Sequence, residues 1–178
     1  MEPTRRLTVT DHDRGAAGLL HVYPVVSRRA GGVSVGINLN PNDACNWRCV
    51  YCQVPGLVRG AAPEIDVERL VAELRGFLAR ARRPEWLEGH VDAPYRRLVD
   101  IAFSGNGEPT TSHQLCEIVA RVLAVLDDEG LQGLGKVLIT NGSMMHRPEV
   151  QQAVRRLGEA GGEVWYKLDS ATALGRRA

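Results

Sequence analysis

The sequence predicts an α/β fold built on a parallel sheet, and the order of its hydrophobic patterns is the reason. Four short apolar or alternating segments are typical of strands, and three longer segments between them carry apolar residues at helical spacing. Strands that alternate with helices form parallel sheets with right-handed crossovers. The expected strands span residues 33–39, 98–103, 136–140 and 164–168, and the expected helices span 67–82, about 112–129 and 148–160.

Length and composition fit one globular domain. With 178 residues, of which 44% are hydrophobic and 24% charged, the chain is able to bury about 70% of its unfolded surface. The net charge of +1 indicates no strong field for nucleic acid or a membrane. No apolar run approaches the roughly 18 residues of a membrane span, and the N-terminus lacks the apolar segment of a signal peptide. We therefore expect a cytoplasmic protein without a membrane partner.

Residues 1–32 show no sustained period, and we expect them to form an N-terminal extension to a domain at 33–178. A short edge strand is expected at 21–26, before a turn that contains Arg28 and Arg29. Contact of this arginine pair with an acidic substrate is one interpretation. Two solvated arginines beside a glycine pair is the favoured one.

The first strand is predicted at 33–39 because apolar and small polar side chains alternate there, and the Asn-Pro-Asn-Asp turn at 40–43 ends it. The first helix is expected to begin at Val67, since Asp66 is a good N-cap and apolar residues follow at helical spacing. Prolines and a glycine between 83 and 96 predict a connection between the first helix and the next strand.

The short apolar run at 98–103 predicts a strand that is covered on both faces. The following helix is expected to be capped by Thr111 or Ser112 and to stop at Gly130. Cys116 lies inside this helix and is interpreted as a small core residue.

The third strand is predicted at 136–140, and Pro148 suits the first position of the third helix. The fourth strand is predicted at 164–168. It carries Trp165 and Tyr166 and is expected to be an apolar edge, which favours association.

Three of the four cysteines, Cys45, Cys49 and Cys52, lie within eight residues at the spacing C-x3-C-x2-C, just after the first strand. Thiolates are soft ligands that suit an iron–sulfur cluster or zinc. A structural zinc site needs four ligands, and the nearest histidines in sequence, His21 and His90, are distant. Three ligands leave an open metal position, which favours a cluster that binds a further ligand directly. A zinc site completed by a distant histidine and a metal-free group of buried thiols stay open as alternatives.

Loops at the carboxyl ends of parallel strands converge on one rim, so residues far apart in sequence become neighbours. Among them, Gly105 and Gly107 allow a ligand to approach the backbone, and Glu108 offers a carboxylate to a cationic group. Alone, this segment is more simply a glycine-rich turn with an exposed acid. Beside the cysteine motif, a binding loop is the favoured interpretation. The four loops are 45–52, 105–110, 141–143 and 167–170.

The cysteine motif resembles that of the radical S-adenosylmethionine (SAM) superfamily, whose signature is C-x3-C-x2-C with an aromatic residue, here Tyr51, before the last cysteine. The resemblance implies a 4Fe-4S cluster held by the three cysteines, with SAM chelated to its unique iron. The superfamily's Gly-Gly-Glu-Pro motif binds the methionyl ammonium of SAM. Gly107, Glu108 and Pro109 match its last three members, and Asn106 departs from the first, which leaves the first backbone contact open.

Two weaker matches lie at later strand ends. Asn141 and Lys167 are similar to polar residues that contact SAM in several branches of the superfamily, although Lys167 also suits a structural ion pair. Together the motifs look like the branch of the wyosine-type tRNA enzymes and their uncharacterised bacterial relatives. Those tRNA enzymes carry further N-terminal cysteines, and none precedes Cys45 here, so the tRNA substrate does not carry over.

The resemblance implies a radical SAM enzyme with a partial (βα) barrel. Its chemistry would be reductive cleavage of SAM to methionine and a 5'-deoxyadenosyl radical, which abstracts hydrogen from an unknown substrate: a small molecule, a protein or a tRNA. An external electron donor of the flavodoxin or ferredoxin type is implied as well. The alternatives are a non-catalytic iron–sulfur electron-transfer module and a zinc-binding module.

The superfamily barrel typically has six strands, and four are predicted here. The segment at 170–178 is too short for another strand–helix–strand unit, which needs about 30 residues. We therefore expect a C-terminally incomplete core that turns over poorly by itself. A truncated reading of a longer protein is the favoured explanation, and a half-barrel that pairs with another chain is the alternative.

Overall fold

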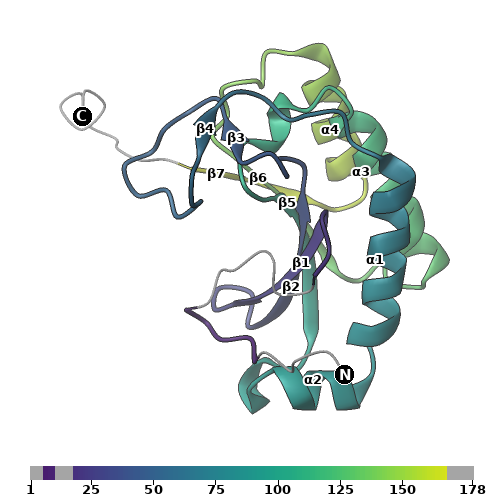
Figure 1. Cartoon of the computed structure of the whole chain (residues 1–178). Coiled ribbons are helices and arrows are strands. Elements are labelled where there is room, and N and C mark those ends of the chain that lie inside the picture. Colours follow the sequence, from purple (N-terminus) through teal and green to yellow (C-terminus); the bar gives the residue numbers. More distant parts are fainter. Residues whose placement is uncertain (1–5, 11–17, 168–178) are drawn as a thin grey trace.

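A five-stranded, mostly parallel sheet forms the centre of the computed structural model, which describes residues 6–10 and 18–167 (Figure 1). The strand order is β1-β2-β5-β6-β7, with β1 antiparallel to β2 and the other neighbours parallel. The α/β class and the parallel sheet predicted from the sequence are confirmed. The strands are β1 (Val22–Ser27), β2 (Gly32–Asn38), β5 (Leu98–Ser104), β6 (Gly135–Thr140) and β7 (Glu163–Tyr166).

All four predicted parallel strands are present as β2, β5, β6 and β7. Strand β7 ends at Tyr166, and Leu168, which was expected to close it, lies outside the described residues. The short strand expected at 21–26 is β1, which lies on the edge next to β2. Its start is fixed to the first helix, because the backbone N–H of His21 donates to Glu73 Oε2 at 2.8 Å.

The first and last helices begin where the sequence predicts. Helix α1 (Val67–Ala81) is capped by Asp66, whose side chain accepts from the backbone N–H of Arg69 at 2.9 Å, an interaction worth about 1 kcal/mol. Helix α4 (Pro148–Glu159) has Pro148 in its first turn.

The chain between helices departs from the predictions in two places. Helix α3 (Leu115–Asp128) begins after Gln114 and not at Thr111 or Ser112, because that segment forms the short 3-10 helix η2 (Pro109–Thr111) and its end. The connection at 83–96 includes a helix that was not expected. It contains helix α2 (Pro84–His90), which starts at a proline, and the 3-10 turn η1 (Ala93–Tyr95).

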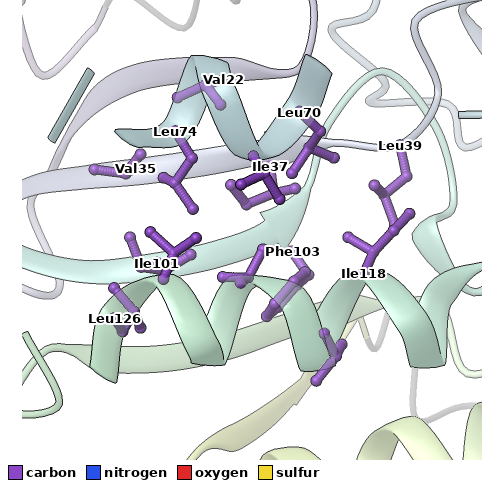
Figure 2. Packing of buried hydrophobic residues seen from close by; sticks show 14 of the residues in the cluster. Val22, Val35, Ile37, Leu39, Leu70, Leu74, Ile101, Phe103, Ile118 and Leu126 are labelled. Atoms are coloured by element: carbon purple, nitrogen blue, oxygen red, sulfur yellow. The ribbon is translucent and has the colours of Figure 1, made fainter. Parts of the chain in front are cut away.

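The hydrophobic core lies between one face of the sheet and helices α1, α3 and α4 (Figure 1). Alternate residues of the central strands point into it, because successive side chains of a strand face opposite sides of the sheet. Figure 2 shows these strand side chains packed against α1 and α3. The two central strands contribute Val35, Ile37, Ile101 and Phe103, all fully buried.

A smaller apolar cluster closes the amino-terminal end of the sheet. It joins Leu7 and Val91, which form an isolated parallel bridge, to Val26 and Val33 of the first two strands. No helix in the described ranges, 6–10 and 18–167, is long and apolar enough to cross a bilayer.

Candidate functional site

The cysteine loop is closed at its base by a two-residue parallel ladder. Strand β3 (Ala44–Cys45) pairs with β4 (Val58–Arg59), and the backbone N–H of Gly60 donates to the carbonyl of Cys45 at 3.0 Å. The intervening residues 46–57 leave the ladder and return to it. The ladder thereby fixes both ends of the segment that carries Cys49 and Cys52.

The three motif cysteines differ in exposure. Cys45 and Cys49 are half-buried, Cys52 is exposed, and none of them is in a disulfide. Burial raises the pKa of the Cys45 thiol, and the negative charge of Glu108 raises it further, while a hydrogen bond from the backbone N–H of Trp47 lowers it. A thiol in such surroundings ionises readily only when a metal or another cation is bound.

Glu108 forms the buried wall of the site. It is 3% exposed, and its Oε1 accepts from the hydroxyl of Thr110 at 2.5 Å and from the hydroxyl of Thr140 at 2.6 Å. The backbone N–H of Thr110 donates to the same oxygen at 3.2 Å, and the N–H of Asn141 donates to Oε2 at 2.7 Å. One carboxylate therefore joins the loops that follow β5 and β6. It is buried, not the exposed acid of the simplest sequence interpretation.

Side-chain amides connect the cysteine loop to both neighbouring strand ends. Asn46 Nδ2 donates to the hydroxyl of Ser143 at 2.7 Å, and Asn46 Oδ1 accepts from Asn141 Nδ2 at 3.0 Å. Asn106 Nδ2 donates to Asp43 Oδ1 at 2.6 Å. The residue that departs from the Gly-Gly-Glu-Pro motif is thus the one that holds the second loop against the first.

The strand-end loops enclose a cavity of about 230 Å³. All nine site residues predicted from the sequence line it, although they come from four separate segments of the chain. Trp47, Gln53, Val54 and Leu57 complete the lining. The predicted residues are Cys45, Cys49, Cys52, Tyr51, Gly105, Gly107, Glu108, Asn141 and Lys167.

Gly105 and Gly107 make room for protein atoms. A Cβ on Gly107 would lie 2.0 Å from the carbonyl oxygen of Ala44, and a Cβ on Gly105 would lie 2.3 Å from Asn38 Oδ1. Gly105 also has a φ of 141°, which L side chains rarely adopt. Close packing of the loops therefore requires glycine at both positions, whether or not a ligand approaches them.

Within the described ranges, no group of three or more His, Cys, Asp or Glu side chains is arranged to hold a metal ion. The chemistry of the donor set nevertheless fits an iron–sulfur cluster, because three thiols from one closed loop border a single cavity. Cys116 is not part of this set. It lies on α3 and packs against the main core, as predicted.

Several residues that build the site were not predicted, Asn46 and Thr140 above all. Both act through hydrogen bonds to residues that are more than thirty positions away. The available signal was their place at strand ends, Thr140 as the last residue of β6 and Asn46 in the loop after Cys45, where polar side chains gather.

Comparison with known proteins gives relatives but no family. No family model matches the chain, and no solved structure matches it. It is similar to the "UPF0026 protein" of two Helicobacter pylori strains, each 29% identical over 135 residues, which make up 74% of this chain and 38% of the relative. It is also similar to a "GTPase Obg" of Brachyspira hyodysenteriae, 27% identical over 131 residues, or 72% of this chain and 16% of that protein. The chain thus spans less than half the length of these curated relatives.

Proposed function

We propose that this chain is a radical SAM protein, in which Cys45, Cys49 and Cys52 hold a 4Fe-4S cluster and the remaining cavity residues bind SAM. The observation that carries the proposal is the cavity itself. The residues predicted to hold the cluster and those predicted to bind SAM come from separate sequence motifs. All of them line this one cavity. When bound, the reduced cluster would supply the electron that cleaves the sulfonium of SAM.

The arrangement of the sheet supports a partial (βα) barrel. Strands β2, β5, β6 and β7 lie side by side in sequence order, and α1, α3 and α4 pack on one face. A doubly wound sheet reverses its strand order and carries helices on both faces, whereas a barrel adds each strand on the same side with helices outside. The observed order therefore favours a section of a barrel.

In this proposal, Glu108 has two tasks. Oε1 accepts three hydrogen bonds from the protein, but Oε2 accepts one, from Asn141. A carboxylate oxygen has two lone pairs, so Oε2 retains acceptor capacity for the methionyl ammonium of SAM. The same side chain would position the loop and contact the ligand.

Lys167, just after β7, and Tyr51, in the cysteine loop, both line the cavity. The positive charge of Lys167 lies near enough to lower the pKa of Cys45, and we assign it to the carboxylate of SAM. Tyr51 is 52% exposed and lies directly before Cys52, where its ring would shield the cluster from water.

Nucleotide hydrolysis, which the name of one relative suggests, is not favoured by this sequence. A phosphate-binding loop has the pattern G-x4-G-K-[ST] between a strand and the helix that follows. Gly130, Gly135 and Lys136 satisfy its first part, but Val137 replaces the hydroxyl residue. The segment also joins helix α3 to strand β6, the reverse order, and Lys136 Nζ donates to the carbonyl of Gln132 at 2.5 Å.

Metal analysis of the purified chain after anaerobic reconstitution tests the proposal. About four irons and four sulfides per chain are expected, with the visible absorption of a cluster. Serine in place of Cys45, Cys49 or Cys52 is expected to remove most of the iron. Cys116→Ser is the matched control and is expected to keep it, because Cys116 packs in the core.

Two results would overturn the proposal. One zinc per chain and no sulfide would indicate a zinc-binding module. Equal loss of iron from the Cys116→Ser variant and the Cys52→Ser variant would show that the loop is not the specific ligand set.

A further inference from the structure

A second cavity, of about 600 Å³, lies on the face of the sheet that α1, α3 and α4 do not cover. This volume falls in the range of about 300–1,000 Å³ that is typical of small-molecule sites. Its lining comes from β1, β2, β5, β6 and β7, from the turn between β1 and β2, and from Val9 near the N-terminus. The cavity is distinct from the cysteine site, and its lining differs throughout.

The floor of this cavity includes buried polar side chains among its apolar lining. Ser34 and Asp100, 6% and 5% exposed, lie on adjacent strands, and the Ser34 hydroxyl donates to Asp100 Oδ1. The hydroxyls of Tyr23 and Ser104 are hydrogen-bonded at 2.7 Å, and the Tyr23 ring fills the space over Gly36. Parallel strands that pack on both faces are continuously apolar. The hydroxyls and the carboxylate on this floor therefore offer partners to a ligand with polar groups.

The rim of the cavity is positively charged. Arg28 and Arg29, both exposed, line it at the turn between β1 and β2, and Arg29 Cζ lies 4.6 Å from the centre of the Trp165 ring. Neither arginine forms an ion pair with an acidic residue of the described chain. Burial raises the pKa of Asp100, so the acid on the floor opposes an anion less than an exposed carboxylate would.

We propose that this second cavity binds a small organic anion, with its carboxylate or phosphate on Arg28 and Arg29 and its polar body on the floor formed by Ser34 and Asp100. Ser104, Ile139 and Trp165 line this cavity, and residues one or two positions further along the chain, just past the ends of the same strands, line the cysteine site. This inference rests on the proposed function: the bound anion is the substrate, so the substrate class is a small anionic molecule. Sequence reasoning favoured solvated arginines here, because it could not show that a cavity adjoins them.

The experiment uses a pair of fluorescent probes that share a ring system and differ in charge: anilinonaphthalene sulfonate, which is anionic, and phenylnaphthylamine, which is neutral. We expect the anionic probe to bind the purified chain at one site and about tenfold more tightly than the neutral probe, since charge-assisted hydrogen bonds to arginine are strong. The double variant Arg28→Ala/Arg29→Ala is expected to remove that preference. The matched control, Arg80→Ala/Arg83→Ala, loses the same charge from the end of α1 and the start of α2 and is expected to keep it.

A third variant, Ala102→Leu, places extra bulk on the cavity floor and is expected to weaken binding of both probes. Equal affinity for the two probes, or an anionic preference unchanged by loss of Arg28 and Arg29, would overturn the proposal. So would unchanged probe binding to a folded Ala102→Leu variant. Because these titrations contain neither iron nor SAM, their outcome is independent of whether the cysteine loop binds a cluster.

Discussion

The two faces of the sheet are made by the same strands and serve different purposes. On the helix-covered face, β2 and β5 present Val35, Ile37, Ile101 and Phe103, each fully buried. On the other face the alternating positions hold small or polar residues, and they floor a cavity. A strand whose side chains alternate in polarity thus supplies stability on one face and a binding surface on the other. The residues on the cavity face are Ser34, Gly36, Asp100, Ala102 and Ser104.

The greatest loss of stability is expected at one of two adjacent positions of β5, which face opposite sides of the sheet. Phe103→Ala removes a fully buried ring from the core and is expected to lower the free energy of unfolding by about 3–5 kcal/mol. Ser104→Ala, on the cavity face, removes one hydrogen bond to Tyr23 and is expected to cost about 1 kcal/mol. Urea unfolding followed by circular dichroism measures both. Similar losses for the two variants would show that the faces are not divided in this way.

The next effect concerns Glu108, at the rim where the strands end. Glu108→Gln turns one acceptor oxygen into a donor amide that opposes the N–H of Asn141 or the two threonine hydroxyls, so a loss of about 2 kcal/mol is expected. Glu64→Gln is the control, because Glu64 is exposed and pairs with exposed His113. A smaller decrease in the free energy of unfolding for Glu108→Gln than for the control would mean that the buried carboxylate does not hold the strand-end loops together.

The smallest change in stability is expected at Asp100, on the cavity floor, and it depends on pH. The folded pKa of Asp100 lies above its ordinary value because of burial, so its stabilising contribution is complete below that ordinary value and is lost as pH rises through the folded pKa. Asp100→Asn carries no charge at any pH. We expect the wild type to lose stability relative to this variant between mildly acidic and neutral buffer.

Thermal unfolding of both proteins at each pH measures this difference. Asp92→Asn is a suitable control, since Asp92 is exposed and pairs with exposed Arg6. A stability of the wild type, relative to Asp100→Asn, that stays constant or increases as pH rises would contradict the assignment of Asp100 to a buried, weakly solvated floor.

Much of the fold could be predicted because its signals are local. Each of these signals acts over a few positions. The alternation in residues 33–39 predicts β2, the cap at Asp66 predicts α1, and the proline at Pro148 predicts α4, and all three elements are present. Helix α2 was missed because Pro84 and Gly89 within it and Pro94 after it are loop signals, although Pro84 is a good first helical residue.

The site was predictable in part for a similar reason. The cysteine spacing and the Gly-Asn-Gly-Glu-Pro segment are compact motifs, and the parallel sheet brings their ends to one cavity. The hydrogen bonds of Asn46 to Asn141 and Ser143 span more than ninety positions, so no local pattern contains them. The cavity on the uncovered face was missed because it depends on which face the helices leave open.

Electron paramagnetic resonance of the reconstituted, reduced chain, with and without SAM, tests whether the cysteine loop holds a cluster that binds SAM. If the three cysteines hold a cluster with an open iron and the cavity beside it binds SAM, saturating SAM shifts the spectrum of the wild type. Asn141→Ala should require a higher SAM concentration for the same shift, since Asn141 lines the cavity and its side chain donates to Asn46 Oδ1 in the cysteine loop. A cluster spectrum that saturating SAM leaves unchanged would contradict the account and indicate simple electron transfer.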